Sequence, residues 1–120
     1  MTPENQVKKA VLELLAAERI FAFRLNTSAT KIGDRFFRSH SLGKGAGDIL
    51  AAPHISTRPA WLWIETKAGK GKQTPEQKEF QEYVESLGHF YVVAYSSDDV
   101  LRKLKEMRFR YAAVCCVPPH

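Results

Sequence analysis

The amino-acid sequence predicts one α/β domain, a sandwich in which helices flank a mixed β-sheet. Apolar residues recur at helical spacing in three segments. The short apolar runs between these segments have the length and composition of strands. The chain has 120 residues, of which 44% are hydrophobic, so we expect a single domain over residues 1–120 with a single core.

The N-terminal half is expected to form one helix followed by short strands. Thr2 is a suitable N-cap, and Pro3 suits the first helical position. The apolar residues that repeat at helical spacing are Val7, Val11, Leu14 and Leu15. A strand is expected over residues 19–27, where Phe21 and Phe23 alternate with Ala22 and Arg24, a short strand between loops within 28–44, and another strand over 48–52.

The C-terminal half alternates strands with helices. The strongest strand signal covers residues 61–67, and another strand is expected over 90–95. Thr74 and Pro75 open a second helix, and residues 96–99 cap a third. The residues expected on the buried faces of these two helices are Phe80, Val84 and Leu87, and Val100, Leu101, Leu104 and Met107.

The segment 105–120 has two possible uses. Residues 111–117 are expected to form a last strand, either within the core or as a dimer element. Cys115 and Cys116 are adjacent, which disfavours both an unstrained disulfide between them and zinc-ligand spacing. We therefore interpret them as packing residues of a reduced chain.

Charged residues stand where two apolar strands begin or end. Glu65 and Lys67 close the strongest strand, and alternation puts them on one face, roughly 7 Å apart. An ion pair at the end of a strand would explain these two residues alone. Asp48, however, begins another apolar strand, directly after a glycine-rich turn. If the two strands are neighbours, the carboxylates converge and repel unless a cation lies between them, and oxygen ligands of this kind suit Mg²⁺ or Mn²⁺.

The motifs Gly47-Asp48-Ile49-Leu50 and Ile64-Glu65-Thr66-Lys67 resemble the PD-(D/E)XK nuclease signature. Within that superfamily the chain is similar to the VRR-NUC family, the virus-type replication and repair nucleases, from about Thr2 to Leu104. The other segments that carry the resemblance are Glu4, the Arg-Leu-Asn-Thr run at 24–27, Thr74-Pro75-Glu76-Gln77, residues 88–94 and residues 97–100.

The resemblance implies a restriction-endonuclease-like α/β/α sandwich and a specific set of site residues. Asp48, Glu65 and Glu4 would be metal ligands, with the backbone carbonyl of Thr66 as a further one. Lys67 would position the attacking water and offset charge on the phosphate. Gln77 matches the glutamine at the start of the helix after the lysine strand.

The positions of Glu4 and Gln77 fit these roles, because both share the apolar face of their predicted helices. Each also has a structural explanation. Glu4 can simply favour the N-terminal end of the helix dipole. Gln77 can be the last residue of a capping box that begins at Thr74.

The chain is basic, with 18 Lys and Arg against 13 Asp and Glu and a net charge of +5, which favours a polyanionic partner. Basic residues concentrate beside the predicted site, in residues 19–48 and 66–78. The residues expected to contact the DNA backbone are Arg24, Asn26, Lys31, Arg35, Arg38, Lys44, Lys70 and Lys72. The alternative is a solvated loop face that aids solubility.

Together these features predict an Mg²⁺- or Mn²⁺-dependent DNA endonuclease, selective for branched DNA and active in replication or repair. The expected partners are duplex, forked or four-way junction DNA and a second copy of the chain, with no small-molecule cofactor and no membrane. No apolar run approaches the roughly 20 residues of a membrane helix, and no secretory signal is apparent, so we expect a cytoplasmic protein of a cell or an infecting virus. The alternatives are a non-catalytic nucleic-acid-binding module or an accessory subunit on the same fold.

Overall fold

The computed structural model describes residues 2–25, 30–32, 35–37, 47–53 and 60–115, with the backbone alone for 30–32, 35–37 and 109–115. The elements, in chain order, are α1 (Pro3–Ala17), β1 (Phe21–Arg24), β2 (Thr30–Ile32), β3 (Arg35–Phe37), β4 (Ile49–Ala52), β5 (Leu62–Thr66), α2 (Pro75–Ser86), β6 (Phe90–Ala94) and α3 (Ser97–Cys115).

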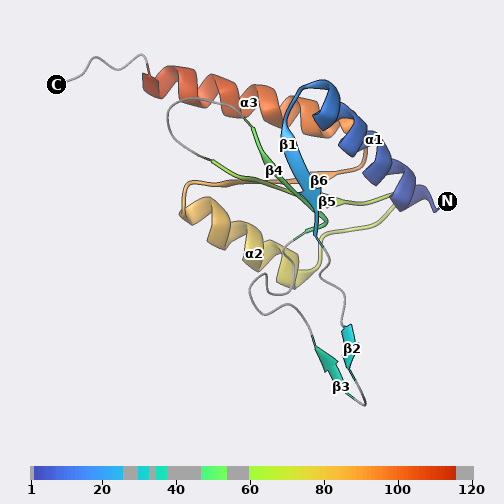
Figure 1. The fold of residues 1–120 in the computed structure, drawn as a ribbon. Helices are drawn as coiled ribbons and strands as arrows, with labels where there is room; N and C mark the ends of the chain where they lie inside the picture. The colour runs from blue at the N-terminus through green and yellow to red at the C-terminus, as the bar shows by residue number, and fades with distance from the viewer. Residues whose placement is uncertain (1, 26–29, 33–34, 38–46, 54–59, 116–120) are drawn as a thin grey trace.

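Four strands form a mixed sheet in the order β1-β4-β5-β6. The β1–β4 and β4–β5 pairs are antiparallel, whereas β5 and β6 run parallel. Helices α1 and α3 cover one face of the sheet, and α2 lies on the other (Figure 1). The predicted α/β sandwich with a mixed sheet is therefore confirmed.

The main core lies between the sheet and the α1–α3 layer. Val11 on α1 and Val100 on α3 are fully buried there with Ile49 and Ile64 from the two central strands. The α2 side is smaller and aromatic. Phe80 packs edge-on against Trp63, with ring centroids 4.9 Å apart, and approaches Tyr91 at 6.3 Å. Burial on both faces explains why β5 has a nearly continuous apolar sequence.

The predicted starts of α1 and α2 are confirmed. The Thr2 hydroxyl accepts a hydrogen bond from the Asn5 backbone N–H at 3.2 Å, and proline follows the cap. Thr74 caps α2 in the same way, as part of a capping box with Gln77. Such caps satisfy backbone donors that the first helical turn leaves unpaired, which is typically worth about 1 kcal/mol.

The alternation in β1 is present, and it is Ala22 that faces the core. Phe21 and Phe23 lie on the opposite side, 71% and 40% exposed, in edge-to-face contact with each other. Within residues 28–44 we expected one short strand, but the structure has two, because β2 and β3 pair as an antiparallel hairpin.

The strand expected over residues 111–117 is wrong as far as Cys115, because α3 continues to that residue. The physical reason lies in the sequence: no glycine or proline interrupts the run after Met107, and the alanine pair within it favours helix. Leu87 is also not part of the buried face of α2. It is 53% exposed, because α2 ends at Ser86 and Leu87 is its C-cap.

None of the helices within the described ranges, α3 included, combines the length and the apolar character needed to span a membrane.

Candidate metal centre

Antiparallel pairing of β4 and β5 brings the two predicted acidic residues to the same end of the sheet. Ile49 pairs with Ile64, so Asp48, just before β4, lies opposite Glu65. The Asp48 backbone N–H donates to the Ile64 carbonyl at 2.8 Å, which extends the ladder by one residue. The predicted approach of Asp48 to Glu65 is thus a consequence of the register between β4 and β5.

Gly47 makes this close approach possible. Its φ is +97°, a value that residues with a side chain rarely adopt. A Cβ atom on Gly47 would also lie 2.9 Å from the Ile64 carbonyl oxygen. The residue before Asp48 is therefore restricted to glycine both by its conformation and by its contact with β5.

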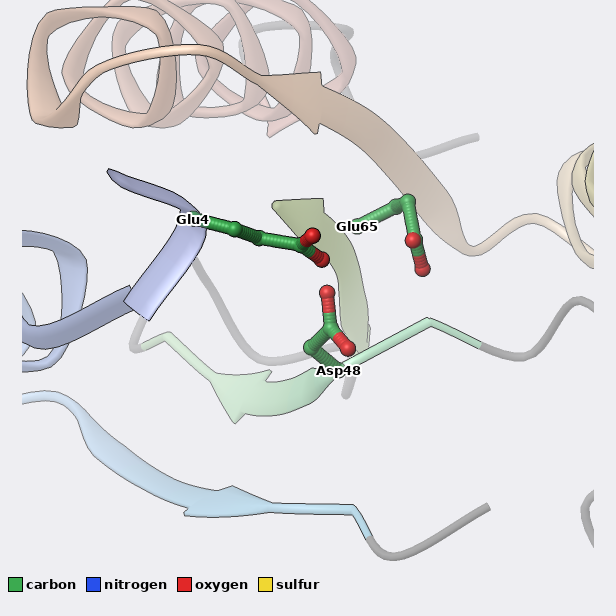
Figure 2. Close-up of side chains that lie close together, drawn as sticks. All are labelled: Glu4, Asp48 and Glu65. Atoms are coloured by element: carbon green, nitrogen blue, oxygen red, sulfur yellow. The ribbon is translucent and has the colours of Figure 1, made fainter. Parts of the chain in front are cut away.

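Glu4 completes a group of three carboxylates. One carboxylate oxygen from each of Glu4, Asp48 and Glu65 lies within 4.8 Å of the others. Figure 2 shows the Glu4 and Asp48 carboxylates facing each other, with Glu65 beside them; the three residues come from the first turn of α1, the residue before β4 and the end of β5. Their exposure differs, since Glu65 is buried, Asp48 is half-buried and Glu4 is exposed. Solvent therefore reaches the three carboxylates at Glu4 of α1, whereas protein atoms cover them at Glu65 of β5.

The two oxygens of Asp48 have different partners. Oδ2 accepts hydrogen bonds from the Thr66 backbone N–H at 2.8 Å and from the Thr66 hydroxyl at 2.7 Å. Oδ1 lies 3.6 Å from the Nζ atom of Lys8 on α1. Thr66 is fully buried, so it holds the carboxylate in a fixed orientation. This leaves Oδ1 as the Asp48 oxygen that faces the Lys8 ammonium group.

Glu65 has a strongly perturbed acidity. Burial, followed by the negative charge of Asp48, raises the pKa of Glu65 to about 7. The Lys67 ammonium, 3.4 Å from the Glu65 carboxylate, and a hydrogen bond with Gln77 oppose this rise. Near neutral pH the Glu65 carboxyl group is therefore balanced between its protonated and ionised forms.

Of the two roles that the sequence left open for Gln77, the structural one is present. Its side-chain oxygen accepts from the Thr74 backbone N–H at 2.8 Å, and the Thr74 hydroxyl accepts from the Gln77 backbone N–H at 3.2 Å. The capping box is therefore present. The same side chain hydrogen-bonds Glu65. The start of α2 is thus tied directly to the carboxylate group.

These side chains can hold a metal ion. Three carboxylates this close together repel one another, and burial increases the cost at Glu65. Lys8 and Lys67 offset part of this charge from two sides. The donor set consists of carboxylate oxygens, which hard divalent cations prefer. The Thr66 carbonyl as a further ligand stays a prediction.

Three residues near this group were not predicted from the sequence. Lys8 follows Glu4 by four residues, so helical spacing places both on one face of α1 and could have identified it. Tyr91, almost fully buried, pairs with Trp63 across β5 and β6, and burial followed by the charge of Glu65 raises its pKa. Gln73 hydrogen-bonds Tyr91, and the Gln73 amide also donates to Gln81 at 2.8 Å.

The predicted DNA contacts are placed unevenly. Arg24 is exposed at the end of β1, where it pairs with Ile49, and Lys70 and Lys72 are exposed in the loop that follows Lys67. Two others, Lys31 and Arg35, lie in β2 and β3, where the structure describes the backbone alone. The remaining three lie outside the described residues: Asn26, Arg38 and Lys44.

Comparisons with known proteins find no matching family model, no matching curated protein and no matching solved structure. The similarity to VRR-NUC nucleases therefore stays a prediction from the motifs. What the fold and the site define by themselves is an α/β protein with a three-carboxylate centre that can hold a metal ion.

Proposed function

We propose that this protein is an Mg²⁺- or Mn²⁺-dependent DNA endonuclease with a restriction-endonuclease-like fold of the VRR-NUC type. The observation that carries the proposal is the convergence of Glu4, Asp48 and Glu65 within 4.8 Å. Lys67 lies beside this group, 3.4 Å from Glu65. A cation-binding set of carboxylates next to a fixed ammonium group is what hydrolysis of an anionic phosphodiester requires.

Glu4, Asp48 through Oδ1, and Glu65 are the residues that would hold the metal, with the Thr66 carbonyl as an added ligand. A bound divalent ion would supply Lewis-acid stabilisation of the phosphoryl charge and a water of lowered pKa. In the reaction, a water oxygen bonds to phosphorus and the bond from phosphorus to the 3′ oxygen breaks. That oxygen takes up a proton, which leaves a 5′-phosphate and a 3′-hydroxyl.

Lys67 would act on the reacting groups directly. Its side chain is only 16% exposed, and the Glu65 carboxylate restrains it. An ammonium group held in this way can donate hydrogen bonds to the attacking water and to a phosphate oxygen. Gln77 and Thr66 would act indirectly, because they orient Glu65 and Asp48 respectively.

Branched DNA, either forked or in four-way junctions, is the proposed substrate, and a homodimer would bring two such sites to two strands. The net charge of +5 supports a DNA partner. Lys70 and Lys72 are exposed in the loop that leaves the Lys67 strand, where they would contact the sugar-phosphate backbone.

The proposal is tested by incubating the protein with forked, four-way, linear duplex and single-stranded DNA in Mg²⁺, Mn²⁺ or EDTA. We expect metal-dependent cleavage of branched DNA that Glu65→Gln abolishes. Glu85→Gln is the matched control, because Glu85 is exposed near the opposite end of α2. Binding without cleavage in either metal would instead favour the non-catalytic module, and equal cleavage by both variants would contradict the proposed site.

A further inference from the structure

A groove runs along α1 beside Arg24 of β1. It is formed by residues between Asn5 and Ala16 of α1 and by Arg24 of β1, and it encloses about 490 Å³. From Asn5 to Ala16 the helix rises about 16 Å, which is the axial length of roughly five nucleotides of one DNA strand. We refer to this feature as the α1–β1 groove.

The groove is connected to the site by covalent and polar contacts. Lys8 lines it and also lies 3.6 Å from Asp48 Oδ1. On the β1 side, the Leu25 backbone N–H donates to the Asp48 carbonyl at 2.7 Å, and Arg24 pairs with Ile49 in the ladder. One end of the groove is therefore fixed at the residue that would bind the metal.

The charge in the groove is opposite to that of the adjoining carboxylates. Its described lining includes Lys8, Lys9 and Arg24 against a single carboxylate, Glu13. The Lys9–Glu13 pair is 4.0 Å apart and about two-thirds exposed, so it neutralises little. Within the described residues no carboxylate pairs with Arg24.

The groove also has an apolar component. Leu12 and Ala16 line it one helical turn apart, following Lys8 on the same face of α1. A groove that has cations beside apolar surface suits a chain of phosphates joined by sugars better than it suits a small free anion. This complementarity identifies the class of ligand.

We propose that the α1–β1 groove binds the sugar-phosphate backbone of the strand to be cut, on one side of the scissile phosphate. Arg24 and Lys9 are the phosphate contacts along the groove, and Lys8 is the contact nearest the metal centre. The assignment rests on the proposed nuclease function for its substrate, but the binding itself needs no catalysis.

The test measures binding of a fluorescein-labelled four-way junction and a labelled single strand by anisotropy, in EDTA, between about 50 and 200 mM salt. We expect Arg24→Ala and Lys9→Ala each to weaken binding and to reduce the slope of log K against log salt by about 1. Lys105→Ala is the matched control, because Lys105 is exposed on α3 and its loss changes the net charge equally.

A second pair of variants blocks the groove without changing charge. Ala16→Trp places a large side chain in the groove, whereas Ala17→Trp places it on the neighbouring exposed position that does not line the groove. We expect DNA binding to weaken at least roughly tenfold in the first variant and to persist in the second. Circular dichroism verifies that each variant is folded.

The inference is wrong if the groove variants bind DNA as the Lys105→Ala and Ala17→Trp controls do. It is also wrong if polyglutamate of matched charge displaces DNA as well as unlabelled DNA does, since the groove would then accept any polyanion. Cleavage in Mg²⁺ is scored separately. Cleavage with unaffected binding in the groove variants contradicts this inference alone, and groove-dependent binding without cleavage contradicts the proposed function alone.

Discussion

Asp48 and Glu65 lie on neighbouring strands at the same end of the sheet, yet their surroundings differ. Thr66 donates two hydrogen bonds to Asp48, and Lys8 approaches its other oxygen. Glu65 is buried on the α2 side, where its pKa is raised to about 7. One pair of strands therefore provides two different carboxylates. Asp48 is held in place by hydrogen bonds, whereas the charge of Glu65 depends on pH or on a nearby cation.

The largest expected effect comes from replacing Lys67, the ammonium group that lies beside Glu65. Lys67→Met should lower the rate of DNA cleavage by roughly 10²- to 10³-fold, because it removes the fixed positive charge beside the reacting phosphate. Metal affinity should change far less than the cleavage rate. Single-turnover cleavage and Mn²⁺ calorimetry separate the two effects, and a parallel loss of both would contradict a direct role for Lys67.

Gly47→Ala should disturb the pairing of the residues around Asp48 with β5, and so the relative position of Asp48 and Glu65. The added Cβ atom meets the Ile64 carbonyl at 2.9 Å at a positive φ, so we expect a loss of about 2–4 kcal/mol in the free energy of unfolding. Gly69→Ala is the control, because Gly69 also has a positive φ but nothing lies within 4 Å of its Cβ position. Urea denaturation measures both, and equal losses would show that the close approach to β5 contributes nothing.

Glu65→Gln should make the protein more stable in EDTA at high pH. Because the folded protein holds the Glu65 proton up to a pKa of about 7 and the unfolded chain only to about 4.5, stability falls as pH rises between these values. The variant avoids this fall, so at pH 8 it should be more stable by up to about 3 kcal/mol, with no such gain at pH 4. A difference that does not vary between these pH values would contradict the assigned cause.

Thr66→Val tests the Asp48 side with a change of similar shape. It removes the 2.7 Å hydrogen bond to Oδ2 and keeps the backbone donor. We expect metal affinity to fall roughly 10- to 100-fold, as is typical when a partner that orients a ligand is lost. Thr74→Val, which removes a helix cap instead, should lower stability by about 1 kcal/mol and leave metal affinity largely unchanged. Equal effects on affinity would refute the orienting role of Thr66.

The sequence was most informative where local chemistry determines structure. The caps at Thr2 and Thr74 follow from residue type and position, and the convergence of Asp48 with Glu65 follows from their places at strand ends. Gly47 marked a turn, but its contact with the Ile64 carbonyl became visible only in the folded sheet.

Features that depend on packing between distant elements were not predictable. Helical spacing places Lys8 on the same face of α1 as Glu4, but its contact with Asp48 depends on the position of α1 relative to β4. Phe21 and Phe23 are exposed, because the face of β1 that packs against the core carries the small side chain of Ala22. The extension of α3 was missed because the small apolar residues before Cys115 also suit a strand.

The most direct test of the account is Mn²⁺ binding to the full chain by isothermal titration calorimetry, with Asp48→Asn and Glu85→Gln as the variant and the control. We expect the unaltered protein and Glu85→Gln to bind Mn²⁺ alike, with proton release below pH 7 as Glu65 ionises, and Asp48→Asn to bind at least roughly 100-fold more weakly. Equal affinities in all three proteins would contradict a metal centre at the ends of β4 and β5.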